Sequence, residues 1–367
     1  MNTSISVTTS PTYTIQINPK LLSTLSETLK PLCKGSQIGI VTHPSLNHLY
    51  GETLSALLKQ AGWTVHTLIV PEGESSKSLP QITHLLDELL VRKFERIDSL
   101  IALGGGVIGD LTGFLASIYL RGIPFVQIPT SLLAQVDAAI GGKTGINHER
   151  GKNLIGSFYQ PKSVLIDPET LKTLPARELK NGLAEVIKYG VIYSPALFEQ
   201  LEKNVSTLTQ WSYASAPELW TDLIIQSAQC KAKVVSEDEK ESHLREILNF
   251  GHTIAHAIEA VFEYGTYHHG EAVALGMIGA GRIAVKLNMW SDAQQKRLET
   301  LIQTLEFDTQ IQPQKASDLM EIMTLDKKVR EGKVRFILPT AFGQVIPRSD
   351  IDSKLIIDTL VHLGATR

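Results

Sequence analysis

The sequence predicts two domains, an α/β domain at residues 1–173 and a mostly α-helical domain at residues 174–367. Three observations support this prediction. A chain of 367 residues exceeds the size at which one hydrophobic core usually keeps growing. The first half alternates β-rich runs with helical segments, which is typical of a mainly parallel sheet covered on both faces. The second half is dominated by long amphipathic segments, which are typical of packed helices.

Strands and helices are expected to alternate along the first domain. Short apolar runs bounded by turn residues predict strands, and apolar residues recurring every three or four positions predict helices. The expected elements are strands at 37–43, 63–70, 99–103, 125–129 and 164–167, and helices at 46–61, 79–94 and 107–120. The polar first ten residues are expected to form a disordered tail.

The second domain is expected to consist mainly of helices. The segments ELKNGLAEVIKYGVI, LIIQSAQCKAKVV and HTIAHAIEAVFEYG carry apolar residues at helical spacing. The change near residue 174, from alternating strand and helix patterns to long helical patterns, therefore sets the predicted boundary.

Composition limits the classes of partner and compartment. Lys and Arg number 35 against 38 Asp and Glu, so binding to nucleic acid or to an anionic membrane through bulk charge is not expected. The cysteines are Cys33 and Cys230, too few for a disulfide framework and typical of a reducing compartment. Neither a signal-peptide pattern nor an apolar run of about 18 residues is present. We therefore expect a globular cytoplasmic protein.

A glycine-rich segment, LGGGVIGDLTG, follows the third expected strand and opens a helix. Gly104, Gly106 and Gly109 fit G-x-G-x-x-G, in which backbone N–H groups approach a pyrophosphate at a helix N-terminus. The acid expected about 20 residues later is absent, because the next strand ends in Pro129 and Thr130. A dinucleotide-binding loop and a tight structural turn both remain open on this pattern.

Two further loops carry residues suited to phosphate. In PEGESSKSL, Glu74 and Lys77 could hydrogen-bond a ribose or a phosphate, although a solvated loop is the alternative. The stretch GGKTGIN at residues 141–147 ends like a P-loop, but that pattern requires a glycine where Asp137 stands. The preceding LLAQVDAAI also has helical spacing, so an ATP loop is rejected. Lys143 remains a candidate anion-binding residue.

Histidines and a glutamate in apolar helical contexts indicate a metal site. His252 and His256 in LNFGHTIAHAIE are spaced i, i+4, so both project from one face of a helix and could chelate a metal. The zinc-protease pattern H-E-x-x-H is not met, because Thr253 follows His252. His269 and Glu185 lie in other helical segments, and two histidines with one glutamate form a known catalytic zinc set. Hydrogen-bonded core side chains are the alternative for each residue alone.

Taken together, these motifs resemble the 3-dehydroquinate synthase family, the second enzymes of the shikimate pathway. The resemblance extends from about residue 71 to residue 343. It is carried by LGGGVIGDLTGFLAS, YLRGIPFVQIPTSLLAQVDAAIGGKTGINH, GKNLIGSFYQP, LAEVIKYG, LNFGHTIAHAIE and HGEAVALGM.

The resemblance implies a fold and a reaction. The family has an α/β nucleotide-binding (Rossmann-like) domain, a mostly helical metal-binding domain, a cleft between them that holds the active site, and usually a homodimer. Its members convert 3-deoxy-D-arabino-heptulosonate 7-phosphate into 3-dehydroquinate and phosphate. NAD takes a hydride from the C5 hydroxyl, phosphate is eliminated, the hydride returns, the ring opens and an intramolecular aldol step closes the carbocycle. The implied cofactors are NAD and zinc, with cobalt as a substitute.

The resemblance also implies roles for individual residues. Glu185, His252 and His269 would be the metal ligands, with His256 as a general base or proton relay. The implied substrate contacts are Lys143, Asn153, Lys188, Lys231, Arg245, Asn249 and Lys327 or Lys328, with Asp137 near the nicotinamide and Arg121 reaching the phosphate from the partner subunit. The implied cofactor contacts are Glu72, Gly73, Glu74, Ser75, Ser76, Lys77, Gly105, Gly106, Val107, Ile108, Gly109, Asp110, Thr130, Ser131, Lys143, Lys152, Thr170, Leu171, Lys172 and Thr173.

The chain departs from the family pattern at two positions. His43 stands where the family usually carries Asp or Asn for the adenosine ribose, which predicts an altered ribose contact. Ala255 replaces a glycine in GHTIAHAIE without changing the spacing of the ligands. Three alternatives are a sister sugar phosphate cyclase of the valiolone or inosose type, a metal-dependent polyol dehydrogenase, and a non-catalytic binding protein.

Overall fold

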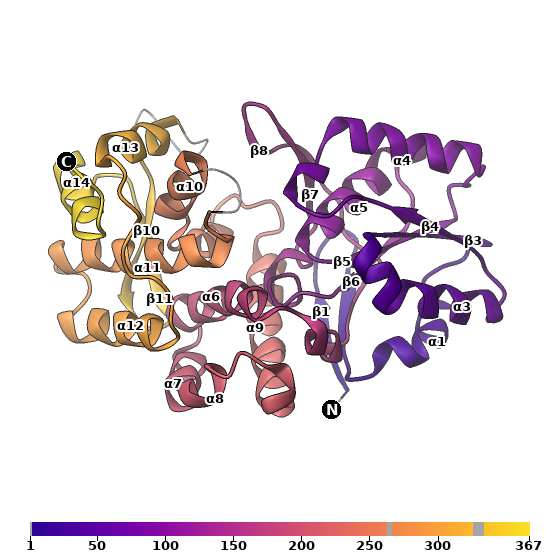
Figure 1. The fold of residues 1–367 in the computed structure, drawn as a ribbon, viewed down its shortest axis with the longest axis horizontal. Helices are drawn as coiled ribbons and strands as arrows, with labels where there is room; N and C mark the ends of the chain where they lie inside the picture. Colours follow the sequence, from indigo (N-terminus) through magenta and orange to yellow (C-terminus); the bar gives the residue numbers. More distant parts are fainter. Residues whose placement is uncertain (1, 263–265, 326–333) are drawn as a thin grey trace. The chain divides into compact units, whose positions relative to one another are not determined.

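The computed structural model describes residues 2–262, 266–325 and 334–367. It divides into two compact units (Figure 1). Unit 1 contains the chain up to Leu174 together with Pro217–Lys240, and unit 2 contains Pro175–Ala216 and Glu241–Arg367. Helix α9 (Pro217–Glu237) thus belongs to unit 1 by its contacts, whereas the predicted boundary after residue 173 assigned it to the helical domain.

Unit 1 is built on a seven-stranded sheet of order β1-β2-β9-β6-β5-β3-β4. Its neighbouring strands are parallel, except that β1 pairs antiparallel with β2. The strands are β1 (Thr3–Val7), β2 (Tyr13–Ile17), β3 (Gln37–Thr42), β4 (Thr64–Ile69), β5 (Ser99–Gly104), β6 (Phe125–Pro129) and β9 (Ser163–Ile166). Parallel strands joined by helices bring all their carboxyl ends to one edge, where ligands of such folds bind.

Helices cover both faces of this sheet (Figure 1). Helices α4 (Leu79–Val91) and α5 (Gly106–Ile118) pack on one face, and α1 (Leu25–Leu29) and α3 (Glu52–Gln60) pack on the other. The strand side chains alternate between the two cores, as the pleat requires. The prediction of a Rossmann-like α/β domain is confirmed.

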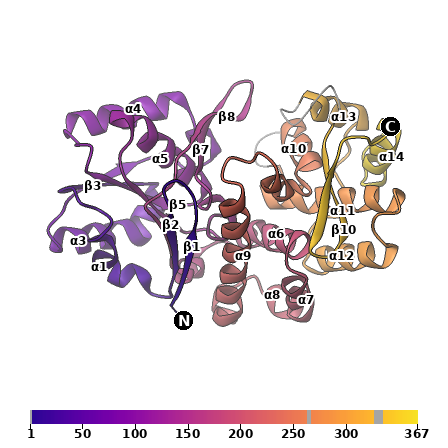
Figure 2. The ribbon, with the colours of Figure 1, turned by 180° about the vertical axis from the view of Figure 1, so that it is seen from behind.

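The N-terminus corrects one expectation. Residues 3–7 are not a disordered tail, because TSISV alternates in polarity and pairs along its whole length with β2, which joins the sheet through β9. Figure 2 shows this hairpin beside α9. The backbone N–H of Thr8 donates to Ser236 Oγ of that helix at 2.8 Å. A second hairpin that was not expected consists of β7 (Lys143–His148) and β8 (Gly151–Phe158).

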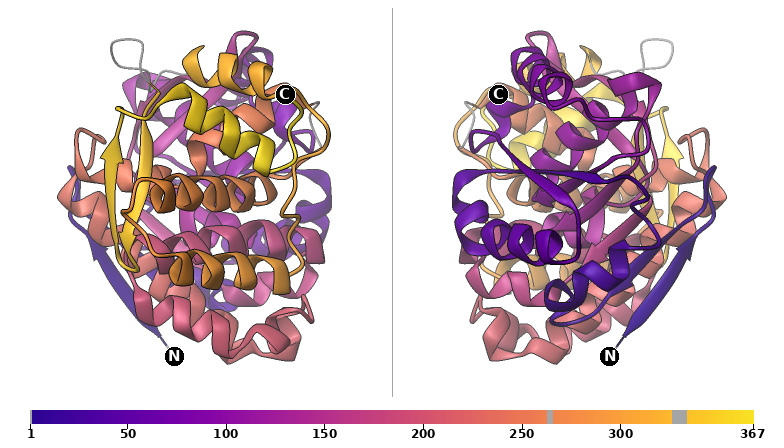
Figure 3. Two further views of the ribbon diagram at one scale, coloured as in Figure 1. Left: turned by 90° about the vertical axis from the view of Figure 1, so that its left-hand side faces the viewer. Right: turned by 90° about the vertical axis from the view of Figure 1, so that its right-hand side faces the viewer.

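Unit 2 is mostly helical, as predicted. Its principal helices are α6 (Ala176–Ile192), α7 (Pro195–Lys203), α8 (Val205–Leu208), α10 (His252–Val261), α11 (His269–Lys286), α12 (Asp292–Thr304), α13 (Ala316–Leu325) and α14 (Ser353–His362). A two-stranded ribbon, β10 (Phe336–Ala341) and β11 (Gln344–Arg348), was not expected, and β10 packs along α11 (Figure 3). In the described parts of the chain, every helix is too short or too polar to cross a bilayer.

Candidate active site

The glycine-rich segment forms the turn from β5 into α5. Gly105 precedes the helix as its N-cap, and the first N–H groups of α5 have no partners within the helix. A Cβ at Gly109 would lie 2.8 Å from Gln127 Oε1 on β6, so a larger residue there would require the Gln127 side chain to move. The partly exposed terminus of this helix can therefore receive an anion such as a pyrophosphate.

A buried lysine links this turn to two other loops. Lys77 is only 4% exposed, and its Nζ lies 2.7 Å from Asp110 Oδ2 and 2.5 Å from Asn153 Oδ1. Burial would lower the pKa of Lys77, but Asp110 and Glu74 raise it above its usual value. Lys77 is therefore a fixed positive charge beside the start of α5, rather than part of a solvated loop.

Asn147 completes this network and was missed from the sequence. Its Nδ2 donates to Glu74 Oε1 at 2.8 Å, and its Oδ1 accepts from the backbone N–H of Asn153 at 2.9 Å. The register of β7 with β8 shifts between Ile146 and His148, so Asn147 lies at a bulge. Side-chain periodicity does not reveal such a bulge, although Asn147 belongs to the GGKTGIN stretch that the sequence singled out.

The GGKTGIN stretch begins with two glycines that the backbone requires. Gly142 has a φ of 66°, and a Cβ there would lie 2.6 Å from the side chain of Gln160. Lys143 follows at the start of β7 and is exposed. The preceding turn at Ala134–Ala138 is π-helical and carries Asp137, whose Oδ1 accepts from Lys231 Nζ of α9 at 2.8 Å. Two predicted site residues, Asp137 and Lys231, are thus brought together within unit 1.

The remaining predicted cofactor contacts follow the carboxyl ends of four strands in unit 1. Such an edge is where open parallel sheets bind ligands. Glu72, Gly73, Glu74, Ser75, Ser76 and Lys77 follow β4; Gly105, Gly106, Val107, Ile108, Gly109 and Asp110 follow β5; Thr130 and Ser131 follow β6; and Thr170, Leu171, Lys172 and Thr173 follow β9. Lys152 lies on β8.

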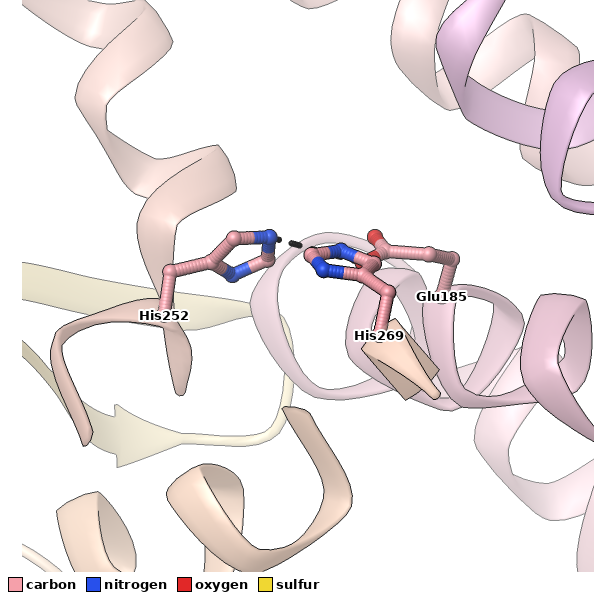
Figure 4. A group of neighbouring side chains, drawn as sticks. All are labelled: Glu185, His252 and His269. Atoms are coloured by element: carbon pink, nitrogen blue, oxygen red, sulfur yellow. Dashed lines mark ion pairs between the residues drawn. The ribbon is translucent and has the colours of Figure 1, made fainter. Parts of the chain in front are cut away.

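Three predicted ligands meet in unit 2, each from a different helix (Figure 4). Glu185 lies on α6, His252 begins α10 and His269 begins α11. Oε1 of Glu185 lies 3.5 Å from His252 Nε2 and 3.3 Å from His269 Nε2, and one ligand atom of each residue lies within 4.8 Å of the others. Glu185 is fully buried. Two imidazoles and a buried carboxylate form a donor set that fits a divalent cation such as Zn²⁺.

Close packing of the three helices places these ligands. A Cβ at Gly276 of α11 would lie 1.9 Å from the carbonyl oxygen of Gly251, the residue before His252. The backbone N–H of Gly270 donates to Asn181 Oδ1 of α6 at 2.6 Å. Because α11 has glycine at both contacts, its backbone can approach α6 and the start of α10 closely.

Both histidines have a partner at the ring nitrogen that faces away from the cluster. His252 Nδ1 lies 3.0 Å from the carbonyl oxygen of Phe250, and His269 Nδ1 lies 3.5 Å from Glu259 Oε2. Burial would lower the pKa of His269, but Glu185 and Glu259 raise it to about 10. Such partners orient the ligands of metal sites. Glu259 was missed, although its position seven residues after His252 places it on the same helix face.

Other predicted substrate contacts surround this cluster. Lys188 is buried and forms an ion pair with Oε2 of Glu185. Arg245 is 1% exposed on the turn Leu244–Asn249, and Asn249 Nδ2 donates to Glu241 Oε1 at 3.0 Å. Glu241 was also missed, and its φ of 58° marks a backbone conformation that is uncommon outside glycine.

Of the four other predicted residues, two lie apart from the three-residue cluster and two lie outside the described residues. His256 is one turn beyond His252, with ring centroids 5.6 Å apart, and lies outside the three-residue cluster. Lys327 and Lys328 lie outside the described residues. Arg121 is exposed in unit 1 at the end of Tyr119–Arg121, where Leu120, Arg121 and Gly122 have consecutive positive φ angles of 47°, 65° and 118°.

Comparison with known proteins gives matches over most of the chain. Residues 67–181 match the family described as 3-dehydroquinate synthase N-terminal, and residues 182–329 match the one described as 3-dehydroquinate synthase C-terminal. The chain is 50% identical over 351 residues to a 3-dehydroquinate synthase from Rippkaea orientalis (strain PCC 8801 / RF-1), which covers 95% of each sequence.

Solved structures of sister cyclases share the fold at lower identity. A 2-epi-5-epi-valiolone synthase from Streptomyces hygroscopicus subsp. jinggangensis 5008, with NAD⁺ and Zn²⁺ bound, is 28% identical with a TM-score of 0.86 over 96% of both chains. A 2-deoxy-scyllo-inosose synthase complexed with carbaglucose-6-phosphate, NAD⁺ and Co²⁺ is 26% identical with a TM-score of 0.87, covering 98% of this chain and 99% of that one.

Proposed function

Because the chain belongs to the 3-dehydroquinate synthase family, we propose that it converts 3-deoxy-D-arabino-heptulosonate 7-phosphate into 3-dehydroquinate and phosphate. The observation that carries this proposal is the 50% identity over 351 residues, which includes both the glycine-rich turn and the Glu185–His252–His269 cluster. Identity to the valiolone and inosose cyclases is only 28% and 26%, which favours the dehydroquinate activity over theirs.

The cofactors are NAD and a divalent cation, Zn²⁺ or Co²⁺, which the sister cyclases contain. When bound, NAD would accept and return the hydride, and the cation would act as a Lewis acid on the substrate hydroxyls. Glu185, His252 and His269 would hold the cation. The N-terminus of α5 would hold the pyrophosphate of NAD, with Lys77 as a nearby fixed charge.

Positive side chains would bind the two anionic groups of the substrate. Lys143, Lys188, Lys231 and Arg245 are proposed substrate contacts, together with the amides of Asn153 and Asn249. Arg245 and Lys188 are almost fully buried, so their charges are poorly screened and would bind a phosphate or carboxylate more strongly than surface charges. Asp137, which accepts from Lys231 Nζ, would hold that ammonium group in place.

His256 would move protons. It lies one helical turn from His252 and outside the three-residue cluster, so it is proposed as a general base beside the cation and not as a ligand. An imidazole changes its protonation near neutral pH, which suits transfer of a proton from a substrate hydroxyl.

The protein would act as a cytoplasmic homodimer. Free, buried Cys33 and Cys230 fit a reducing compartment. In unit 1, Ile118 and Leu120, which precede Arg121, are 41% and 38% exposed, and Phe158 on β8 is 46% exposed. Apolar exposure next to two consecutive non-glycine residues with positive φ, Leu120 and Arg121, supports an interaction site. A second copy of the chain would cover this surface and receive Arg121.

Release of inorganic phosphate tests the activity. Metal-loaded protein should release phosphate from the heptulosonate phosphate with catalytic amounts of NAD, and a chelator should stop the release. NADH should not accumulate, because the hydride returns to the substrate in each turnover. Stoichiometric NADH would instead indicate a polyol dehydrogenase, and metal-loaded protein that releases no phosphate would refute the proposal.

A further inference from the structure

The N-terminal hairpin, β1 with β2, contacts the end of α9 (Figure 2). The backbone N–H of Thr8 donates to Ser236 Oγ on this helix. The backbone N–H of Ser10, in the turn of the hairpin, donates to Glu239 Oε2, just after the helix, at 3.1 Å. Helix α9 carries Lys231, a proposed substrate contact. The first ten residues, which were expected to form a tail, therefore hold a helix that bears part of the proposed substrate site.

The same hairpin reaches the GGKTGIN stretch through Tyr13, the first residue of β2. Tyr13 is 3% exposed, and its hydroxyl accepts a hydrogen bond from the backbone N–H of Gly141 at 3.0 Å. Gly141 and Gly142 are buried and have positive φ angles of 102° and 66°. Because a buried N–H group needs an acceptor, the hydroxyl stabilises one conformation of this turn. The exposed Lys143 follows directly.

Gln160 connects the two places that the hairpin contacts. It is buried, and its carboxamide packs against Gly142, where a Cβ would lie 2.6 Å from it. Its Nε2 donates to Glu239 Oε1 at 2.9 Å, and the other oxygen of Glu239 accepts from Ser10. The backbone N–H of Tyr159, the preceding residue, donates to the carbonyl oxygen of Gly142 at 2.8 Å. The turn of two glycines, the end of α9 and the hairpin are thus linked through one chain of contacts.

The hydroxyl of Tyr13 acts through the backbone that it holds. A phenylalanine ring would fill the same space, so the contribution of the oxygen is its hydrogen bond to the turn. A lysine side chain is long and flexible, so the position of its ammonium group depends on how firmly its backbone is held. In a mobile turn, Lys143 would have to be ordered when the substrate binds, and that ordering lowers affinity. A residue that fixes the turn therefore favours substrate binding without touching the substrate.

We propose that Tyr13 is a positioning residue for substrate binding. Its hydroxyl fixes the turn of two glycines before Lys143, so that this lysine is held where it meets an anionic group of the substrate. This inference rests on the proposed function, since it takes Lys143 as a substrate contact. The contacts of the hairpin with the end of α9 place Lys231 on the same support. The N-terminal hairpin thus supports two of the positive charges that bind the substrate.

Steady-state kinetics of Tyr13→Phe, which loses the hydroxyl and keeps the ring, test this role. The variant should raise KM for the heptulosonate phosphate by about five- to tenfold, because one hydrogen bond is lost. Its kcat should stay within about twofold of wild type, because the groups that act in the chemical steps are unchanged. Ser163→Ala is the matched control. The buried Ser163 of β9 donates its hydroxyl to the carbonyl oxygen of Thr14, the next residue of β2, at 2.7 Å, so this variant loses a buried hydrogen bond to the same strand and should keep the wild-type KM.

Two further measurements separate positioning from packing. Hydrogen exchange of the peptide that contains residues 139–146 should be faster in Tyr13→Phe than in the wild type and in Ser163→Ala, because the turn opens more often. In the Lys143→Ala background, Tyr13→Phe should change kcat/KM by less than about twofold, since both substitutions act on one contact with the substrate.

Four results would overturn the assignment. These are a wild-type KM in Tyr13→Phe, an equal rise of KM in Ser163→Ala, unchanged hydrogen exchange of the turn, and effects of Tyr13→Phe and Lys143→Ala on kcat/KM that multiply. Hydrogen exchange does not depend on turnover, so it tests the turn independently of the reaction. A wrong proposed function would instead appear as an absence of phosphate release from the metal-loaded wild-type protein.

Discussion

In unit 1 most of the candidate cofactor contacts follow the ends of strands, whereas in unit 2 the candidate metal ligands lie on helices packed around a buried carboxylate. The unit 1 groups are joined through a network in which Lys77, Asp110, Asn153, Asn147 and Glu74 each contact at least one other member. In the unit 2 cluster, Glu185 is fully buried and both histidines approach one of its oxygens.

This difference predicts different responses to mutation. A network in which several contacts share one ligand loses affinity gradually, because the remaining contacts still hold the ligand. A three-ligand cation site fails when one ligand is removed, because the two remaining ligands bind the cation weakly. The buried carboxylate then also loses the cation as its partner. Large, all-or-none effects are therefore expected in unit 2 and smaller, graded effects in unit 1.

The largest expected effect is loss of the metal. His252→Ala should abolish binding of Zn²⁺ and lower turnover by roughly a thousandfold or more, since Lewis-acid assistance is worth several kcal/mol. His256→Ala should keep the metal and slow turnover by about a hundredfold, the range of general acid–base catalysis. Metal content by atomic emission, together with phosphate release, distinguishes the two. Equal metal loss in both variants would show that the i, i+4 pair binds the cation jointly.

Substitution of Arg121 tests whether a residue of unit 1 contributes to the active site of a partner subunit. Arg121→Ala alone should slow turnover by roughly a hundredfold, as expected for loss of a charge-assisted contact to phosphate. An equal mixture with the inactive Lys188→Ala protein should recover about a quarter of wild-type activity. About half of the dimers are then mixed, and in each mixed dimer one of the two sites has both its own Lys188 and Arg121 from the other subunit. Exchange of subunits is verified by mass spectrometry. A mixture no more active than the sum of its parts would mean that Arg121 acts within its own chain.

Residues that support the ligands give a matched comparison of the two regions. Glu259→Gln removes the carboxylate 3.5 Å from His269 Nδ1 and should weaken Zn²⁺ binding by about 10- to 100-fold. Asn147→Ala removes one member of the unit 1 network and should weaken NAD binding by only a few-fold. Competition with a chelating dye and nucleotide titration measure the two affinities. If Asn147→Ala has the larger effect, the contrast between a graded and an all-or-none site fails.

Periodicity and glycine spacing predicted much of unit 1, but not its polar network. Five of the parallel strands are apolar or β-rich runs, so β3, β4, β5, β6 and β9 were predicted from the sequence, as was the turn into α5. The strands β1 and β2 were both missed, because five-residue runs with alternating polarity, such as TSISV and YTIQI, carry little signal by themselves. Asn147 was not predicted as a member of the network, because strand register and a bulge bring its partners near.

The Glu185–His252–His269 cluster shows a different limit. Spacing within a single helix pointed to His252 and His256, whereas the cluster combines His252 with Glu185 and His269 from two other helices. Periodicity identifies a helix face but does not say which helices meet, so only the family resemblance named this set. Glu259 was accessible in principle, because it shares the face of His252.

The smallest expected effects come from two glycines, and they compare the packing of the two regions. A methyl group at Gly276 would lie 1.9 Å from the carbonyl oxygen of Gly251, so Gly276→Ala should lower the free energy of unfolding by about 1–3 kcal/mol and weaken metal binding as α10 shifts. At Gly106 a methyl group would lie 3.3 Å from Cβ of Ala138, a contact that a small shift relieves.

Gly106→Ala should therefore leave the stability within about 0.5 kcal/mol of wild type while weakening NAD binding, since the second glycine of this turn lets the backbone approach the pyrophosphate. Chemical denaturation and nucleotide titration of both variants separate packing from ligand contact. Destabilisation by Gly106→Ala as large as that by Gly276→Ala would show that the glycine-rich turn is as tightly packed as the metal centre. The loops of unit 1 would then tolerate change no better than the helices of unit 2.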